Sequence, residues 1–239
     1  MANAAVLGIA HRGASGYAPE NTVAAIDEAI RLGALAVEFD VRLCADGIPV
    51  VLHDSTVDRT TNGKGAVCDL TRLSLLRLDA GSWKHPRFAG TRIPTVDEAL
   101  RAIDEQAIPV LELKTPLDPA LLETLLRDND ALRRAVLLSF DPEILAAMRR
   151  RMPTVTLGLL GNSWRPDLPL RCRQLDARIL AMNLTALTLE RVEKAGKENR
   201  RCWCYTANDA GTVAACAAMG VQGIITDFPD LIRSRKRPG

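Results

Sequence analysis

The chain has 239 residues, of which 47% are apolar and 25% charged, and its net charge at neutral pH is only +2. That composition is typical of a globular protein, and so small a charge gives no reason to expect nucleic acid as a partner. Aromatic residues make up 4%, which also argues against a surface for stacking bases. No segment reaches the roughly 20 apolar residues that cross a bilayer, so we expect no transmembrane segment.

The N-terminus and the cysteines bear on the compartment of the protein. The N-terminus lacks the basic region of a signal peptide, and its apolar run is interrupted by His11 and Arg12. The six cysteines show no paired zinc-type spacing. Cys202 and Cys204 share a strand face, but no further soft ligands lie near them in the sequence. We therefore expect reduced thiols in a cytoplasmic protein.

Short β-like runs alternate with amphipathic helical runs along the chain. Eight strands are predicted, at residues 6–10, 36–41, 109–113, 135–139, 154–160, 178–182, 201–206 and 223–226. Helical patterns lie between most of them, at residues 23–32, 96–105, 119–127, 142–150, 188–197 and 209–219. The interval 161–177 contains two prolines and predicts no clear helix.

Two of these helices carry start signals. Asn21 or Thr22 is expected to cap the first helix, which Gly33 ends. For Asn21, this capping role is preferred over a place in a functional site. Thr95, followed three residues later by Glu98, predicts a capping box at the start of the second helix.

Eight β units, most of them followed by a helix, predict an α/β protein with the (β/α)8 architecture of a TIM barrel. A doubly wound open sheet is the alternative, because a strand count made from sequence can be off by one. Barrels of this length are routinely one domain, so we expect a single domain over residues 1–239.

About fifty residues separate the second strand from the helix that begins after Thr95, which is too long for a bare loop. Asp46-Gly47 predicts a two-residue hairpin turn followed by an antiparallel return strand. In that register His53 lies opposite Asp40. The rest is polar and rich in turns, so we expect a small inserted subdomain at about residues 47–93 that covers the active face.

Chemically active residues cluster at the predicted carboxyl ends of the strands, where barrel enzymes place their catalytic groups. They are three carboxylates, two cations and two histidines: Glu38, Asp40, Glu112, Arg12, Lys114, His11 and His53. Buried carboxylates cost several kcal/mol unless they are paired or bind a metal. Three of them without a nearby thiol suit a hard divalent ion, Mg²⁺ or Ca²⁺. A salt-bridge cluster through Arg12, Lys114 and Arg42 is the structural alternative.

Two histidines beside such an ion favour acid–base chemistry, because imidazole titrates near neutral pH. Arginine and lysine match phosphate oxygens and stabilise the charge that develops on them. A metal ion can do the same and can orient the attacking oxygen. The residues alone therefore predict metal-assisted cleavage of a phosphate ester, with a small molecule as the partner.

An ordered set of motifs between about residues 9 and 230 resembles the glycerophosphodiester phosphodiesterase family. The motifs are HRG, PENT, EFDVRL, DGIPVVLHD, DRTTNGKG, LDAGSW, IPTVDEAL, LELK and GIITDFPD. The short chain without a signal peptide resembles the cytoplasmic bacterial branch of that family. The resemblance implies a barrel with a subdomain inserted after the second strand. It also implies hydrolysis of glycerophosphocholine, glycerophosphoethanolamine and similar diesters to sn-glycerol 3-phosphate and an alcohol.

The resemblance also implies roles for the residues at the strand ends. His11 and His53 match the catalytic histidines, and Arg12 and Lys114 match the groups around the phosphate. The residues that match the ligands of one divalent ion, Mg²⁺ or Ca²⁺, are Glu38, Asp40 and Glu112. In relatives the attacking group is either the glycerol hydroxyl of the substrate or a water, and the sequence leaves both open.

One departure concerns the aromatic residues near the seventh barrel strand. This chain has Tyr205-Thr206 where the family has Trp-Thr, and Trp203 lies on the same strand face. Trp203 and Tyr205 are therefore expected to form a wall beside the substrate. His85, the third histidine, is expected to have a surface or packing role. Two other functions stay open: lysophospholipase D-type activity on lipids with one acyl chain, and non-catalytic binding of a phosphorylated polyol. The oligomeric state is not predicted.

Overall fold

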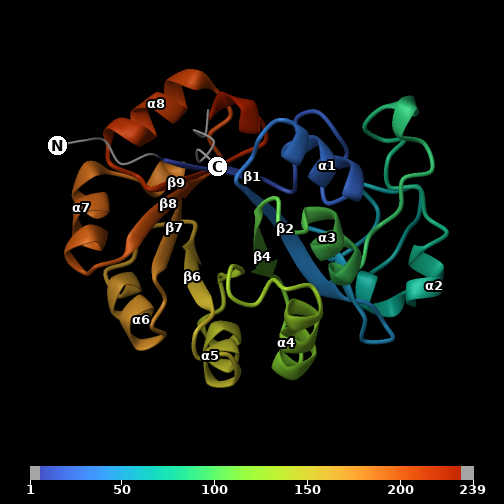
Figure 1. Ribbon diagram of the computed structural model, residues 1–239, viewed down its shortest axis with the longest axis horizontal. Coiled ribbons are helices and arrows are strands. Elements are labelled where there is room, and N and C mark those ends of the chain that lie inside the picture. The colour runs from blue at the N-terminus through green and yellow to red at the C-terminus, as the bar shows by residue number, and fades with distance from the viewer. Residues whose placement is uncertain (1–5, 233–239) are drawn as a thin grey trace.

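A computed structural model describes residues 6–232, so both ends of the predicted domain over residues 1–239 lie outside the described part. Eight parallel strands form a ring with helices around it (Figure 1). The strands of the ring are β1 (Leu7–Ala10), β2 (Ala36–Leu43), β4 (Ile108–Leu113), β5 (Val136–Ser139), β6 (Thr156–Gly161), β7 (Ile179–Asn183), β8 (Arg201–Tyr205) and β9 (Gly223–Thr226). Because β1 pairs with both β2 and β9, the sheet closes on itself. The predicted barrel is confirmed, and the open sheet is excluded.

The helices lie outside the ring (Figure 1). They are α1 (Val23–Arg31), α2 (Arg72–Leu75), α3 (Val96–Ile103), α4 (Pro119–Asp128), α5 (Pro142–Arg151), α6 (Leu168–Gln174), α7 (Leu189–Lys197) and α8 (Ala210–Ala218). All except the short α2, which belongs to the segment between β3 (Pro49–Val51) and α3, cover the outer face of the ring (Figure 1). The helix α6 occupies the interval whose pattern predicts no clear helix. Within residues 6–232, no helix is long and apolar enough to cross a membrane.

Local sequence signals explain where α1 and α3 begin. The Thr22 hydroxyl caps α1 by accepting a hydrogen bond from the backbone N–H of Ala25 at 3.2 Å. The predicted capping box of α3 is confirmed, because Thr95 accepts from the Glu98 N–H while the Glu98 carboxylate accepts from the Thr95 N–H. Such reciprocal caps satisfy backbone donors that a helix terminus leaves free.

Apolar side chains form three separate buried clusters. The largest lies between the barrel wall and the surrounding helices. A second fills the barrel interior, where Ile9, Val110 and Trp203 meet, so the barrel has a packed core below its mouth. The third includes Val57 and Leu75 and lies under the segment between β3 and α3. This segment, residues 52–94, is called the insertion below. It extends from cyan to green beside the ring in Figure 1.

The strand β3 (Pro49–Val51) pairs antiparallel with the part of β2 that extends past β1. The pairing is antiparallel, as the hairpin signal predicts, but the predicted register is wrong by one residue. Leu43 pairs with Pro49, and the Gly47 N–H donates to the Cys44 carbonyl at 2.9 Å. The loop therefore has three residues, with Gly47 in the left-handed region at φ +73°. A glycine is suited to that conformation because it lacks a Cβ.

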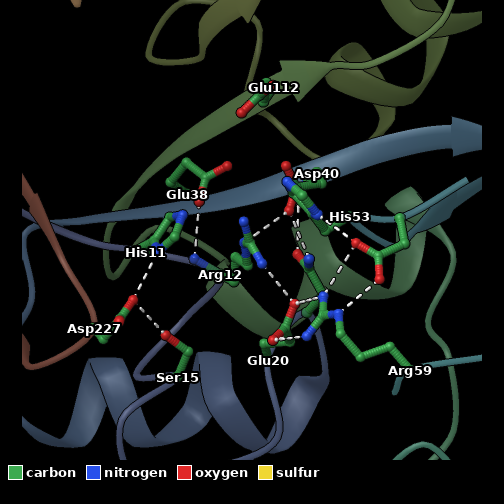
Figure 2. A network of polar contacts seen from close by, with 12 residues as sticks. His11, Arg12, Ser15, Glu20, Glu38, Asp40, His53, Arg59, Glu112 and Asp227 are labelled. Carbon is green, nitrogen blue, oxygen red and sulfur yellow. Dashed lines mark hydrogen bonds and ion pairs between the residues drawn. The ribbon is translucent and has the colours of Figure 1, made fainter. Parts of the chain in front are cut away.

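The register error moves the residue opposite Asp40. The Leu52 N–H, not that of His53, donates to the Asp40 carbonyl, at 3.0 Å. The strand β3 ends at Val51, so His53 lies in the turn that leads into the insertion. There its side chain is free to turn back toward the barrel mouth, as Figure 2 shows.

Candidate active site

The carboxyl ends of β1, β2 and β4 bring together the three predicted carboxylates, the two cations and His11, and the turn after β3 adds His53 (Figure 2). Asp40 on β2 is the register partner of Glu112 on β4, and both point into the barrel mouth. Glu38 lies two residues before Asp40 on the same face of β2, because side chains alternate along a strand. His11 and Arg12 directly follow β1.

Three carboxylates form a cluster at the centre of the site. Each of Glu38, Asp40 and Glu112 offers an oxygen within 4.8 Å of the others. Glu38 and Asp40 are 2% and 1% exposed. Burial, followed by the charge of Asp40, raises the pKa of Glu38 to about 8. Burial and Asp40 also raise the pKa of Glu112.

Two cations form ion pairs with Asp40, and neither forms an ion pair with the Glu38 carboxylate. The Lys114 ammonium lies 3.0 Å from Asp40 and also contacts Glu112. The Arg12 Nε lies 3.3 Å from Asp40, at an angle that forms no hydrogen bond. Burial tends to raise the pKa of Asp40, but Lys114 and Arg12 outweigh it and hold the pKa below its ordinary value. Asp40 is therefore ionised at neutral pH.

The oxygens of Glu38 decide whether ion pairs alone account for the cluster. Its Oε2 accepts a hydrogen bond from the Arg12 N–H at 2.8 Å, but its buried Oε1 has no partner within residues 6–232. Arg42 does not fill that role, since its Nε donates to the His53 carbonyl at 2.9 Å. An orphaned buried oxygen beside two further carboxylates fits a hard divalent cation that takes oxygen ligands.

A tight turn after β1 brings the Arg12 N–H to Glu38. Arg12 and Gly13 both adopt left-handed conformations, with φ of +54° and +77°. A Cβ at Gly13 would lie 2.5 Å from the carbonyl carbon of Ala25, so only glycine fits. The HRG motif thus combines a histidine, a cation and the residue that lets the turn pack on α1.

Asn21 belongs to the site, and the prediction that it caps α1 is wrong. It has φ +59°, and this left-handed turn directs its side chain toward β2. Its Nδ2 donates to the Asp40 carboxylate at 2.7 Å, and its Oδ1 accepts from the Asp40 N–H at 3.1 Å. Asparagine tolerates this conformation better than most residues, and the adjacent Thr22 takes over the cap.

The two histidines flank the carboxylates, and each is oriented by an aspartate. His11 lies beside Glu38, with its Nδ1 2.6 Å from Asp227 (Figure 2). His53 lies beside Asp40, with its Nδ1 2.7 Å from Asp54. An aspartate on Nδ1 fixes the ring and leaves Nε2 for chemistry.

The two imidazoles have opposite pKa shifts. Burial lowers the pKa of His11, but the Asp227 hydrogen bond and the Glu38 charge outweigh it, so the pKa is raised. Burial also lowers the pKa of His53, and there it outweighs Asp40 and Asp54. Groups of the same type with diverging pKa values are suited to opposite proton-transfer roles.

A chain of ion pairs ties the insertion to the barrel. Glu20 accepts from Arg12 at 2.7 Å and, with both oxygens, from Arg59 at 2.8 Å. Arg59 also donates to Asp54 at 2.6 Å, and Asp54 in turn holds His53. The position of His53 therefore depends on a network that spans β1, the loop before α1 and the insertion.

Sequence reasoning missed four of these polar residues: Glu20, Asp54, Arg59 and Asp227. Asp54 directly follows a candidate histidine, and Asp227 directly follows the last strand, so strand-end position could have found both. Glu20 and Arg59 carry no such signal, because their pairing joins loops that are distant in the sequence.

The two aromatic residues of β8 lie at different depths. Trp203 is 2% exposed and packs within the barrel interior, where its ring lies against Gly223. Tyr205 is half-buried at the mouth, where it donates to Asn162 at 3.2 Å and packs edge-on against Phe140. Tyr205 therefore lies at the mouth and Trp203 in the barrel interior below it, and the wall beside the substrate stays a prediction.

The fold and the site together define a (β/α)8-barrel enzyme equipped to cleave phosphate esters. The sequence pattern of the glycerophosphoryl diester phosphodiesterase family matches residues 11–231. The chain belongs to this family.

Full-length relatives agree with this assignment. The chain is 35% identical to a glycerophosphodiester phosphodiesterase of Caldanaerobacter subterraneus, over 97% of this chain and 98% of the relative. It is 37% identical to YhdW of Bacillus subtilis, over 94% and 95% of the two chains. A solved structure of an Oleispira antarctica phosphodiesterase, in complex with the product sn-glycerol-3-phosphate, superposes with a TM-score of 0.89 at 30% identity and covers 94% of each chain. The solved structure of a glycerophosphodiester phosphodiesterase from Agrobacterium tumefaciens superposes with a TM-score of 0.82 at 32% identity. It covers 94% of this chain and 97% of its own.

Proposed function

We propose that this enzyme hydrolyses glycerophosphodiesters such as glycerophosphocholine and glycerophosphoethanolamine to sn-glycerol 3-phosphate and an alcohol. His11 and His53 transfer the protons, and Glu38, Asp40 and Glu112 hold one divalent ion, Mg²⁺ or Ca²⁺. The observation that carries the proposal is the pair of aspartate-oriented imidazoles on the two sides of one buried carboxylate cluster.

Cleavage of a phosphodiester needs a base for the attacking hydroxyl and an acid for the leaving alcohol. One imidazole takes the proton of the attacking group, which is either a water or the glycerol hydroxyl of the substrate. The other imidazole gives its proton to the departing alkoxide. Asp227 and Asp54 hold the rings and stabilise each imidazolium when it forms.

The phosphate meets positive charge on the side of the carboxylate cluster. Arg12 and Lys114 are nearly buried and provide N–H donors for the phosphoryl oxygens. When bound, the divalent ion would act as a Lewis acid that offsets the charge on those oxygens. The desolvated setting strengthens each of these interactions relative to water.

The direct test of the proposed function is a substrate panel crossed with a metal panel. Purified enzyme with Mg²⁺ or Ca²⁺ should release glycerol 3-phosphate from glycerophosphocholine and glycerophosphoethanolamine, as measured by a coupled dehydrogenase assay. A cyclic phosphate detected by ³¹P NMR during turnover would assign the attack to the glycerol hydroxyl. No release from any deacylated diester with either metal would overturn the proposed substrate class.

Lysophospholipids are the second candidate substrate, and the insertion supports them only weakly. Leu73 and Trp83 are 62% and 40% exposed, which could serve an acyl chain. Leu75, however, is fully buried in the separate core of the insertion. We therefore expect faster turnover of glycerophosphocholine than of lysophosphatidylcholine, and the reverse order would favour the lipid.

Replacing Asp227 by asparagine tests whether it positions His11. An amide can hold the ring in the wrong tautomer, so we expect kcat to fall by roughly 10²- to 10⁴-fold. Loss of the charge also lowers the pKa of His11, so its limb of the pH–rate profile should move toward acid pH. Asp230→Asn, in the same turn but bonded to Tyr17, should keep normal kinetics. If the pH–rate profile of the Asp227→Asn enzyme were unshifted, the proposed role of Asp227 in positioning His11 would be contradicted.

We also propose a cytoplasmic location for the enzyme. All six cysteines are free, and one of them, Cys68, is exposed, where an oxidising compartment would act on its thiol. Reduced thiols are the rule in a reducing compartment. Fractionation of cells that express the tagged full chain would contradict the proposal if the enzyme appeared outside the cytoplasm.

A further inference from the structure

A second polar hollow opens at the amino ends of the barrel strands, opposite the end that carries the carboxylate cluster. Its volume is about 730 Å³, and its lining comes from the starts of β6, β7 and β8 and the residue before β9. Ile179 is the one large apolar side chain among the lining residues. A hollow of this size and polarity suits a hydrophilic small molecule rather than an acyl chain.

Three arginines and one carboxylate provide the charge of this hollow. Arg178, Arg200 and Arg201 line it together with Asp176. The Arg201 N–H donates to the Arg178 carbonyl at 2.8 Å, so the three side chains start from adjacent backbone. Like charges placed this close repel each other unless an anion lies between them.

The protein itself provides little compensation for these arginines. Arg200 is only 15% exposed, and its nearest carboxylate oxygen, on Asp176, is 3.9 Å away, beyond hydrogen-bond reach. The Arg200 Nε is buried without a hydrogen-bond partner within residues 6–232. The negative charge of Asp176 is also shared with a second arginine, because its Oδ2 lies 4.0 Å from the Arg149 guanidinium.

The other two arginines are exposed at the hollow. In the described part of the chain, the side chains of Arg178 and Arg201 form neither an ion pair nor a hydrogen bond. Arg59, by contrast, donates to two carboxylates at 2.6 to 2.8 Å. The fork of donors on each guanidinium is thus available to a ligand.

We propose that this hollow binds a phosphorylated ligand with at least two negative charges, at a site separate from the catalytic one. One guanidinium group can donate two parallel hydrogen bonds to two oxygens of a phosphate. Several arginines together can therefore balance more than one negative charge on a ligand. Asn199, also among the lining residues, offers a further polar contact, whereas the side-chain amide of Gln222 is engaged by the backbone of Cys202 and Gly220. The same phosphate chemistry is available from a free polyphosphate and from an anionic lipid headgroup.

The test uses tripolyphosphate as a probe and isothermal titration calorimetry on the full chain in EDTA. The double variant Arg178→Gln/Arg201→Gln should weaken binding at least about tenfold, since charge-assisted hydrogen bonds are lost. The matched control Arg77→Gln/Arg133→Gln removes two exposed arginines elsewhere and should bind like the parent. Lys114→Ala, which changes the catalytic end, should also leave this binding intact.

Each outcome decides the proposal. Loss of tripolyphosphate binding in the arginine pair alone supports it. Absence of binding, or binding that Arg178→Gln/Arg201→Gln retains in full, overturns the proposal for a free polyphosphate, so that only the lipid form of the ligand is left to test. That form is tested by sedimentation with vesicles of equal parts phosphatidylcholine and phosphatidylglycerol. If the parent enzyme sediments with these vesicles and Arg178→Gln/Arg201→Gln does not, the phosphate that the hollow binds is that of a lipid headgroup. If the parent enzyme binds neither the vesicles nor tripolyphosphate, the proposed site is refuted. The single variant Arg178→Gln provides the same readout if the double variant folds poorly.

Discussion

Replacing His11 by alanine is expected to lower kcat by roughly 10²- to 10⁴-fold, the usual contribution of a general acid or base. In the proposed mechanism, the variant loses the proton-transfer group that lies beside Glu38 (Figure 2), and the carboxylates and cations are unchanged. Substrate binding should therefore change less than kcat, and a Michaelis–Menten analysis on glycerophosphocholine separates the two. The same result is expected for His53→Ala.

The third histidine is the control for this experiment. His85 lies in the insertion, where its ring accepts a hydrogen bond from the Arg87 N–H at 3.1 Å. His85→Ala should keep kcat within a few-fold of the parent enzyme. Undiminished turnover in His11→Ala would remove the assigned role from that residue.

Removal of the divalent ion is expected to lower turnover about as strongly as the loss of a histidine. Chelation by EDTA, or Glu38→Gln, should reduce turnover by roughly 10³-fold, since a Lewis acid contributes several kcal/mol. A second readout is independent of activity. Mg²⁺ or Ca²⁺ should raise the melting temperature of the parent enzyme and much less that of Glu38→Gln, because ligand binding stabilises only the folded state.

The same experiment has a defined pH dependence. The pKa of Glu38 is raised to about 8, chiefly by burial and then by Asp40, so below that pH the ion must displace a proton. Ion affinity should therefore rise as the pH approaches 8 and level off above it. Glu190→Gln, an exposed change on α7, is the matched control. A Glu38→Gln enzyme stabilised by the ion as strongly as the parent would contradict the ligand assignment.

The fold could be predicted well because its signals are periodic. Each strand of the ring is a short apolar run, and each cap and breaker acts within a few residues of its helix. The hairpin register failed for a local reason, since Gly47 supports a three-residue loop as readily as the predicted two-residue turn. Only the observed hydrogen bond to Cys44 distinguishes the two.

The site was predictable where its residues come from strand ends. Glu38, Asp40 and Glu112 meet because two parallel strands pair in register. Asn21 and Glu20 could not be assigned in this way, since their roles depend on backbone conformation and on loop contacts distant in the sequence. Residues that position other side chains are therefore harder to recognise in a single sequence than the candidate catalytic and metal-binding residues at the strand ends.

The ion pairs of Glu20 with Arg59 have a consequence for how the enzyme loses activity. The carboxylates belong to the barrel wall, whereas His53 and Asp54 enter with the insertion, which has a core of its own. Partial opening of that small unit would withdraw one imidazole while the barrel stays folded. Mild heat or denaturant should thus inactivate the enzyme before its far-ultraviolet circular dichroism changes.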